Sequence, residues 1–252
     1  MTTKLKFLGF SSFLITTGNN TKIIIDPYLN DNHASPLKVK DIEALDLILV
    51  SHGAFDHLGD SAQLAIKFNC PVICGGDSKL LLIEQGVPAK NIIETTWGLT
   101  VQASGIKVRP VESRHRSAVK LKDGSIVSAL PLGFIIYTED GVRIYNASDT
   151  ALFSDMKLLG ELYKPHIGLM NVTIENCFDF LPEFLTGEMT PYEAALASQW
   201  LNLEYAIACH YTKKDCPDIE QFVDLLNNMK SDEKPYVTPI AMNPGEEFIY
   251  EK

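Results

Sequence analysis

The chain has 252 residues, and its 46% hydrophobic and 21% charged residues are typical of a folded globular protein rather than a disordered one. A formal net charge of −10 argues against nucleic acid or an anionic membrane surface as a partner, since phosphate groups require a basic face, and no apolar stretch reaches the roughly 20 residues of a membrane span. The five scattered cysteines do not indicate a disulfide framework, and the N-terminal residues lack the apolar core of a signal peptide, so we expect a cytoplasmic protein.

Strand-like and helix-like patterns alternate through the first half of the chain. Alternating apolar residues such as Leu5 and Phe7 predict strands, whereas apolar residues recur at helical spacing through Leu64 and Phe68. The predicted strands lie at about 5–7, 13–15, 22–26, 47–50 and 71–74, and the predicted helices at about 59–68 and 77–84. We expect Asp77 to be the N-cap of the second of these helices.

The second half begins with a stretch rich in strands. The predicted strands form a meander at about 101–111 and then lie at 134–137, 142–145 and 205–209 and near 237 and 248, and the predicted helices lie at about 153–162, 191–201 and 219–229. The turn Asp140-Gly141 predicts that 134–137 and 142–145 form a hairpin. Thr190, Pro191 and Glu193 have the order of a capping box with proline in the first turn, which predicts a helix start.

Both halves, about 1–125 and 126–252, carry strands first and helices after. We interpret them as two parts of one domain that spans residues 1–252. An arrangement that buries the apolar faces of both sets of strands packs two sheets face to face and covers each outer side with helices. The predicted fold class is therefore α/β, with the four layers of an αββα sandwich.

Nitrogen and carboxylate donors stand just beyond several of the predicted strands, where loops hold functional groups on a rigid scaffold. The candidate metal ligands are His52, Asp56, His57, His115, Asp149 and His210. Imidazole together with carboxylate suits Zn²⁺ first, with Mn²⁺ or Fe²⁺ as the other candidates. No cysteine pair lies among these residues, which argues against a structural thiolate site. The pattern predicts a site for one or two divalent ions.

The segments HGAFDHLGD, ESRHRS, SDTALFSDM and CHY resemble, in this order, the metal motifs of the metallo-β-lactamase superfamily. Within it, the chain is most similar to metal-dependent hydrolases like those of the L-ascorbate-6-phosphate lactonase branch. The resemblance covers nearly the whole chain, including IIIDPYL near the start and TPYEAALASQW near the end. It implies an αββα sandwich with metal ions at one edge of the two sheets, in agreement with the fold predicted from the pattern.

The resemblance also assigns ligands. His52, Asp56 and His57 match the first histidine, the aspartate and the last histidine of the motif HxHxDH, but Ala54 stands where the family has its middle histidine. By analogy, the first ion would be held by His52, the residue at position 54, His115 and Asp149, and the second ion by Asp56, His57, Asp149 and His210. Losing a ligand weakens binding, so we expect tight occupancy of the second position and weak occupancy of the first. Ala54 is consistent with natural divergence and with an introduced substitution.

The function expected from this resemblance is metal-dependent hydrolysis of a small ester, lactone or phosphoester. A homo-oligomer is a candidate assembly. The resemblance implies a catalytic role for Asp56, which would bind the metal and hold or transfer the proton of the attacking water. Ala54 favours an alternative class, a metal-binding or ligand-sensing protein with little catalysis. The ligands also suit an iron-dependent oxidoreductase, but we find no flavin-type motif or redox partner domain.

Basic side chains beside the candidate ligands suggest an anionic substrate. Arg114 and Arg116 flank His115, and Lys213 and Lys214 follow His210, although solvated loop charges are the alternative for each of them. Asp26, which the resemblance matches to an aspartate that orients a metal-binding histidine, could equally be a residue that starts a turn before proline.

The remaining candidates have weaker support. Tyr211 could donate a hydrogen bond to a substrate oxygen, but buried tyrosines are common. Glu175 and Glu188 could face the cleft, although we expect them at the surface. Cys70 and Cys74 share one face of a predicted strand without a second cysteine pair, so we expect them in the core.

Overall fold

The computed structural model describes residues 2–172, 187–229 and 236–251, which form two mixed sheets. The first sheet contains, in spatial order, β16 (Glu247–Glu251), β1 (Thr2–Phe7), β2 (Phe13–Thr16), β3 (Lys22–Ile25), β4 (Leu47–Leu49), β5 (Val72–Cys74) and β6 (Ile92–Glu94). The second contains β15 (Thr238–Ile240), β14 (Tyr205–Cys209), β13 (Ile167–Asn171), β12 (Arg143–Asn146), β11 (Leu132–Tyr137), β8 (Ile106–Glu112) and β7 (Val101–Ala103). A separate small hairpin is formed by β9 (Val119–Lys120) and β10 (Ile126–Val127).

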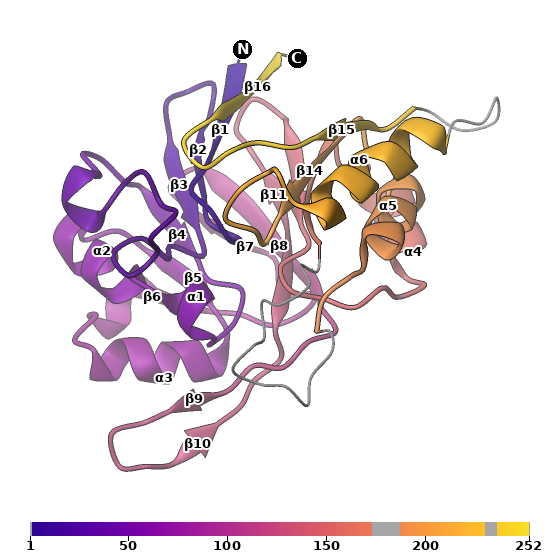
Figure 1. Cartoon of the computed structure of the whole chain (residues 1–252). Coiled ribbons are helices and arrows are strands. Elements are labelled where there is room, and N and C mark those ends of the chain that lie inside the picture. Colours follow the sequence, from indigo (N-terminus) through magenta and orange to yellow (C-terminus); the bar gives the residue numbers. More distant parts are fainter. Residues whose placement is uncertain (1, 173–186, 230–235, 252) are drawn as a thin grey trace.

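Helices cover the outer faces of both sheets. Those beside the first sheet are α1 (Phe55–Leu58), α2 (Ser61–Phe68) and α3 (Gly76–Glu84), with short 3₁₀ turns at Val39–Asp41 and Ala89–Asn91. Those beside the second are α4 (Met156–Tyr163), α5 (Pro191–Trp200) and α6 (Pro217–Asn228). Figure 1 shows the two sets of helices on opposite sides of the strands. The predicted four-layer αββα arrangement is confirmed.

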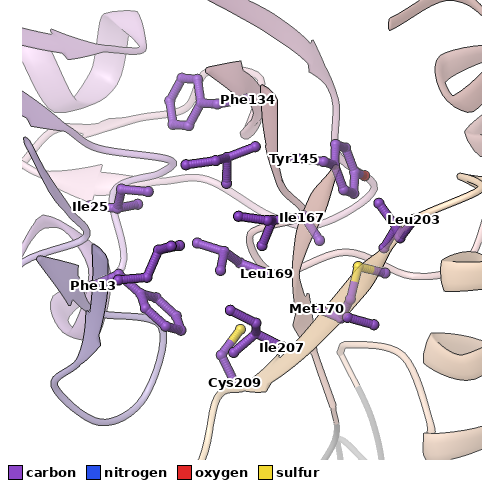
Figure 2. Close-up of a cluster of buried hydrophobic side chains, with 14 of the residues drawn as sticks. Phe13, Ile25, Phe134, Tyr145, Ile167, Leu169, Met170, Leu203, Ile207 and Cys209 are labelled. Atoms are coloured by element: carbon purple, nitrogen blue, oxygen red, sulfur yellow. The ribbon is translucent and has the colours of Figure 1, made fainter. Parts of the chain in front are cut away.

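Apolar residues on both faces of the strands explain the layers. Ile23 and Ile25 of β3 belong to the core between the sheets, whereas Ile24 belongs to the separate cluster under α2 and α3. Figure 2 shows Phe13 and Ile25 of the first sheet facing Leu169 of the second. Each fully buried side chain of this size contributes about 1.5–3 kcal/mol. Strands that are apolar on both faces require cover on both sides, and the helices provide it.

The two sheets do not coincide with the sequence segments 1–125 and 126–252. Strands β7 and β8 lie before residue 125 but belong to the second sheet, and the C-terminal β16 belongs to the first. There β16 pairs antiparallel with β1, with Thr3 opposite Tyr250, which brings the two ends of the chain together (Figure 1). Pairing between strands far apart in sequence decides this arrangement, and local patterns do not contain it.

Several local predictions need correction. The N-cap of α3 is Gly75, and Asp77 lies inside the first turn of the helix. Strand β13 was not predicted, because all of its residues are buried in a parallel arrangement and show no alternation. The capping box of α5 is confirmed, with Glu193 N donating to Thr190 Oγ1 and Thr190 N donating to Glu193 Oε2.

The described cysteines are free and buried, as expected for core residues. Burial raises the pKa of the Cys74 thiol to about 12, so this thiol remains protonated at neutral pH. Among the described residues, no helix combines the length and the apolar character that crossing a bilayer requires.

Candidate metal centre

The loops after the carboxyl ends of four strands, together with the short helix α1, meet at one edge of the two sheets. The predicted donors all lie on these segments: His52 after β4, His115 after β8, Asp149 after β12, His210 after β14, and Asp56 and His57 in α1. Strands β8 and β12 both pair antiparallel with β11 and therefore run in the same direction, and β13 and β14 continue this direction in parallel. Shared strand direction places the ends at one edge, where ligands of such sheets bind.

One group of four side chains can offer its ligand atoms to a single ion. Atoms of Asp56, His57, Asp149 and His210 lie within 4.8 Å of one another. Nε2 of His57 is 3.0 Å from Asp149 Oδ2 and 3.6 Å from Asp56 Oδ2. Nε2 of His210 is 3.4 Å from Asp149 Oδ2 and 3.6 Å from Asp56 Oδ2. Adjacent ligands of a tetrahedral ion with 2.0–2.1 Å bonds are about 3.3–3.4 Å apart, so this spacing suits a zinc-sized ion.

A second group shares one residue with the first. Atoms of His52, His115 and Asp149 also lie within 4.8 Å of one another. Nε2 of His52 and Nε2 of His115 are each 4.0 Å from Asp149 Oδ2, the same oxygen that faces the first group. The carboxylate of Asp149 therefore lies between two candidate positions, as a bridging ligand would.

Hydrogen bonds behind the imidazoles direct their Nε2 atoms into the centre. His57 Nδ1 donates to Asp26 Oδ2 at 2.9 Å, and His115 Nδ1 donates to the carbonyl of Gly187 at 3.0 Å. The Ser51 hydroxyl donates to Asp26 Oδ2 and so accepts from His52 Nδ1, 3.0 Å away. The free lone pair of His52 is then on Nε2, which is buried and has no hydrogen-bond partner among the described residues. A metal ion supplies the partner that such a nitrogen needs.

The backbone is strained close to the centre. His210 has φ +72°, and Asp26 and Ser148 have φ +44° and +57°, values that side chains other than glycine rarely adopt. His210 N donates to the carbonyl of Phe10, and Phe10 N donates to the carbonyl of Tyr211. This pairing across the two sheets holds His210 in its conformation. We did not predict the contribution of Phe10, since it depends on contact between segments about 200 residues apart.

The electrostatics of the centre reflect burial and two carboxylates. Burial disfavours the charged form of His57 and of His210, but the surrounding carboxylates, Asp149 foremost, outweigh it and raise the pKa of both imidazoles well above the usual value. Burial and the neighbouring His57 lower the pKa of His52 well below its usual value. Burial alone would raise the pKa of Asp149, but His210 and His57 hold it well below its usual range. The anionic field that retains these protons would equally attract a divalent cation.

The predicted substrate-binding cations lie at the rim of the centre. Arg114 and Arg116 are exposed on either side of His115, and Lys213 is exposed after His210. Arg114 pairs with Glu112, its Nε 2.8 Å from Oε1. All three cations are accessible to solvent and can contact a ligand from there.

Two other candidates differ from their expected placement. The Tyr211 hydroxyl is buried, donates to the carbonyl of Met242 and accepts from its backbone N, and is therefore engaged in the fold rather than directed at a ligand. Glu188 was expected at the surface but is only 4% exposed and lies in the field of His210, Asp149 and His115. Glu175 lies outside the described residues.

Ala54 is the N-cap of α1, with extended φ and ψ angles, and its carbonyl accepts from the backbone N of His57 and Leu58. It is half-buried. The backbone of Ala54 thus starts the turn that carries Asp56 and His57, while its methyl group offers no ligand atom.

Comparison with known proteins identifies the family of this chain. The family described as "Beta-lactamase superfamily domain" matches residues 21–211. A UPF0173 metal-dependent hydrolase of Methanobrevibacter smithii is 35% identical over 248 residues, 98% of this chain and 97% of that protein. Igni18, a metallo hydrolase from Ignicoccus hospitalis, is similar over 100% of both chains with a TM-score of 0.79 and 24% identity. CmlA, a diiron β-hydroxylase from Streptomyces venezuelae, is similar over 99% of this chain and 54% of its own, with a TM-score of 0.67 and 12% identity.

The fold and the cluster of potential metal ligands define a protein of the metallo-β-lactamase fold. The chain belongs to the β-lactamase superfamily and, within it, to the UPF0173 metal-dependent hydrolases.

Proposed function

We propose that this chain is a hydrolase that uses one or two divalent metal ions to activate water. The observation that carries the proposal is the convergence of two groups of donors on the single carboxylate of Asp149. In this proposal, Asp56, His57, Asp149 and His210 hold one ion, and His52, His115 and Asp149 hold the other. Zn²⁺ fits the donor set best, and Mn²⁺ or Fe²⁺ also suits imidazole and carboxylate.

When bound, such an ion lowers the pKa of water and polarises the carbonyl or phosphoryl oxygen of a substrate. Asp56, whose carboxylate lies 3.6 Å from Nε2 of both His57 and His210, would hold or transfer the proton of the attacking water, the role that the resemblance implies. Asp26 and Ser51 keep His57 oriented through the hydrogen bonds on its Nδ1 side. Proton transfer by a positioned carboxylate typically contributes about 10²–10⁴-fold to a rate.

We propose a small anionic ester, lactone or phosphoester as substrate. The exposed guanidinium groups of Arg114 and Arg116 and the ammonium group of Lys213 lie on loops that carry candidate ligands. Arginine recognises carboxylate and phosphate through paired hydrogen bonds, which suits a negatively charged substrate. A lactone substrate agrees with the resemblance to the L-ascorbate-6-phosphate lactonase branch. A homo-oligomer in the cytoplasm is part of the same proposal.

The position held by His52 and His115 lacks the ligand that a histidine at residue 54 would supply. We therefore expect it to bind its ion more weakly than the position held by His57 and His210, by at least about 10–100-fold, the effect of losing even an outer partner. This difference supports the second candidate function, a metal-binding or ligand-sensing protein with little catalysis. Oxidative chemistry like that named for CmlA has only the shared fold in its favour.

Metal analysis of the purified chain after dialysis against Zn²⁺ tests the proposal. We expect one tightly bound ion and a second, weaker one, together with hydrolysis of a panel of small lactones and phosphoesters. No bound metal under metal-replete conditions would refute the proposal. The variant Ala54→His separates the two candidates: a rise in hydrolysis by orders of magnitude identifies a weakened enzyme, whereas restored second-ion binding with no hydrolysis of any substrate favours the sensing protein.

A further inference from the structure

A buried chain of hydrogen bonds joins the two loops that carry His52 and His115. The backbone N of Gly53, next to His52, donates to Ser117 Oγ at 3.0 Å, and Ser117 Oγ in turn donates to Asp77 Oδ2. Asp77 and Ser117 are 1% and 2% exposed. Because one hydroxyl serves both bonds, the carboxylate of Asp77 fixes the Ser117 loop and, through it, the loop of Gly53.

Asp77 is itself held firmly by α3. It is the second residue of this nine-residue helix, and its Oδ1 accepts from the backbone N of Ser78 at 2.6 Å. A carboxylate in the first turn is stabilised by the helix dipole, which offsets part of the cost of burying its charge. The helix therefore fixes the position of Asp77, and Asp77 Oδ2 accepts the hydrogen bond from Ser117 that connects the two histidine loops.

The loops meet closely where this chain passes. A Cβ atom at Gly53 would lie 2.4 Å from Val119 Cγ1 of β9 and 3.4 Å from Asp77 Oδ2. The Ser128 hydroxyl also donates to the carbonyl of Ser117. Only glycine allows the His52 loop to approach Ser117 and β9 this closely. The close contact between these loops therefore depends on glycine at residue 53 and on the hydrogen bonds of Ser117.

We propose that Asp77 is a positioning residue that sets the separation of His52 and His115 and thereby the affinity of the ion position between them. The inference rests on the proposed function, since it concerns an ion at that position. The two imidazole rings are 5.1 Å apart, centroid to centroid. Hydrogen bonds to Ser51 and to the carbonyl of Gly187 orient the two rings, and the link through Ser117 and Asp77 joins the loops that carry them. Asp56, His57 and His210 lie outside the chain of hydrogen bonds.

The test compares Zn²⁺ binding to the wild-type chain and to Asp77→Asn and Ser117→Ala by calorimetry, with Co²⁺ absorption spectra as a second readout. The variant His115→Ala shows which of the two binding steps in the titration belongs to the ion at the His52–His115 position. We expect Asp77→Asn and Ser117→Ala each to weaken binding at that position by about 10–100-fold, the effect seen for outer partners of metal ligands. The position held by Asp56, His57 and His210 should keep its affinity and its Co²⁺ spectrum.

The double variant Asp77→Asn/Ser117→Ala should weaken binding at the His52–His115 position no more than either single variant, because both changes interrupt the same series of hydrogen bonds. Asp123→Asn is the matched control: its exposed carboxylate accepts from Ser125 N and Ser125 Oγ but touches neither histidine loop, so binding at both ion positions should be unchanged. Equal weakening at both positions, or wild-type binding in both single variants, would overturn the inference alone. A wild-type chain that binds no ion would overturn the proposed function as well. Should Asp77→Asn fail to fold, Ser117→Ala, which keeps the charge, decides.

Discussion

Asp26 allows the sharpest test of how the centre is held. Its buried carboxylate accepts from Ser51 N at 2.7 Å, from Ser51 Oγ at 2.7 Å and from His57 Nδ1 at 2.9 Å. Asp26→Ala leaves the buried Ser51 N–H without a partner, which costs about 1–3 kcal/mol of stability. It also removes a charged hydrogen bond to His57, which contributes about 1.5–3 kcal/mol. We therefore expect the free energy of unfolding in the presence of a chelator to fall by about 2.5–6 kcal/mol. Asp26→Asn keeps an oxygen for Ser51 N and should lose about 1.5–3 kcal/mol.

Metal binding separates stability from positioning. Both Asp26 variants should bind Zn²⁺ at the position of His57 about 10–100-fold more weakly, because the ring is no longer oriented from behind. Chemical denaturation measures the stability, and calorimetry with Zn²⁺ measures the affinity. Asp46→Asn is a suitable control, since this exposed carboxylate accepts from Lys22 N at the start of the same strand, β3, far from the centre. Wild-type Zn²⁺ affinity in both Asp26 variants would refute this account of His57.

Three further outcomes follow from the same geometry. Asp149→Ala should abolish binding at both ion positions, whereas His115→Ala and His210→Ala should each abolish binding at one of them. Equilibrium dialysis with metal analysis measures this, and one ion retained by Asp149→Ala would contradict the shared role of Asp149. Zn²⁺ at 100 times its dissociation constant should stabilise the folded chain by about 2.7 kcal/mol. At about 2–4 °C per kcal/mol, this raises the unfolding temperature by roughly 5–11 °C, and a chelator should reverse the shift in a melting experiment. Thr190→Ala should lower the unfolding temperature by about 2–4 °C through loss of about 1 kcal/mol of capping, and an unchanged melting curve would show that the box at α5 contributes nothing.

The positions of the candidate ligands could be predicted because their signals are local. Donor residues placed just after strand-like segments indicate loops that meet at one sheet edge when the strands run in the same direction, so His115 and His210 could be grouped with His52 as candidates before their contacts were known. The layers could be predicted for a related reason. Strands such as β3, apolar on both faces, require cover on each side.

The residues that orient these ligands could not be predicted in the same way. Gly187 accepts from His115 through its backbone carbonyl, a group that every residue possesses. Ser117 joins two loops through its hydrogen bonds with Gly53 and Asp77, and Glu188 is buried although its segment has no helix or strand pattern. Such roles depend on the path of the backbone between distant segments. Candidate ligand residues can therefore be predicted from the sequence more readily than the hydrogen bonds that orient their side chains.

Hydrogen bonds within the described part of the chain orient three of the candidate ligands or their loops. His57 is aimed by Asp26, His115 by the carbonyl of Gly187, and the loop of His52 by Ser117. Many small metal-binding domains fold only with their ion, because the ion itself gathers the ligands. Here hydrogen bonds within the sandwich also orient the ligands, so we expect alanine at residue 54 to weaken one ion position without unfolding the chain. In the proposed function, the residue at position 54 therefore distinguishes a hydrolase from a sensing protein, and the Ala54→His variant tests that distinction.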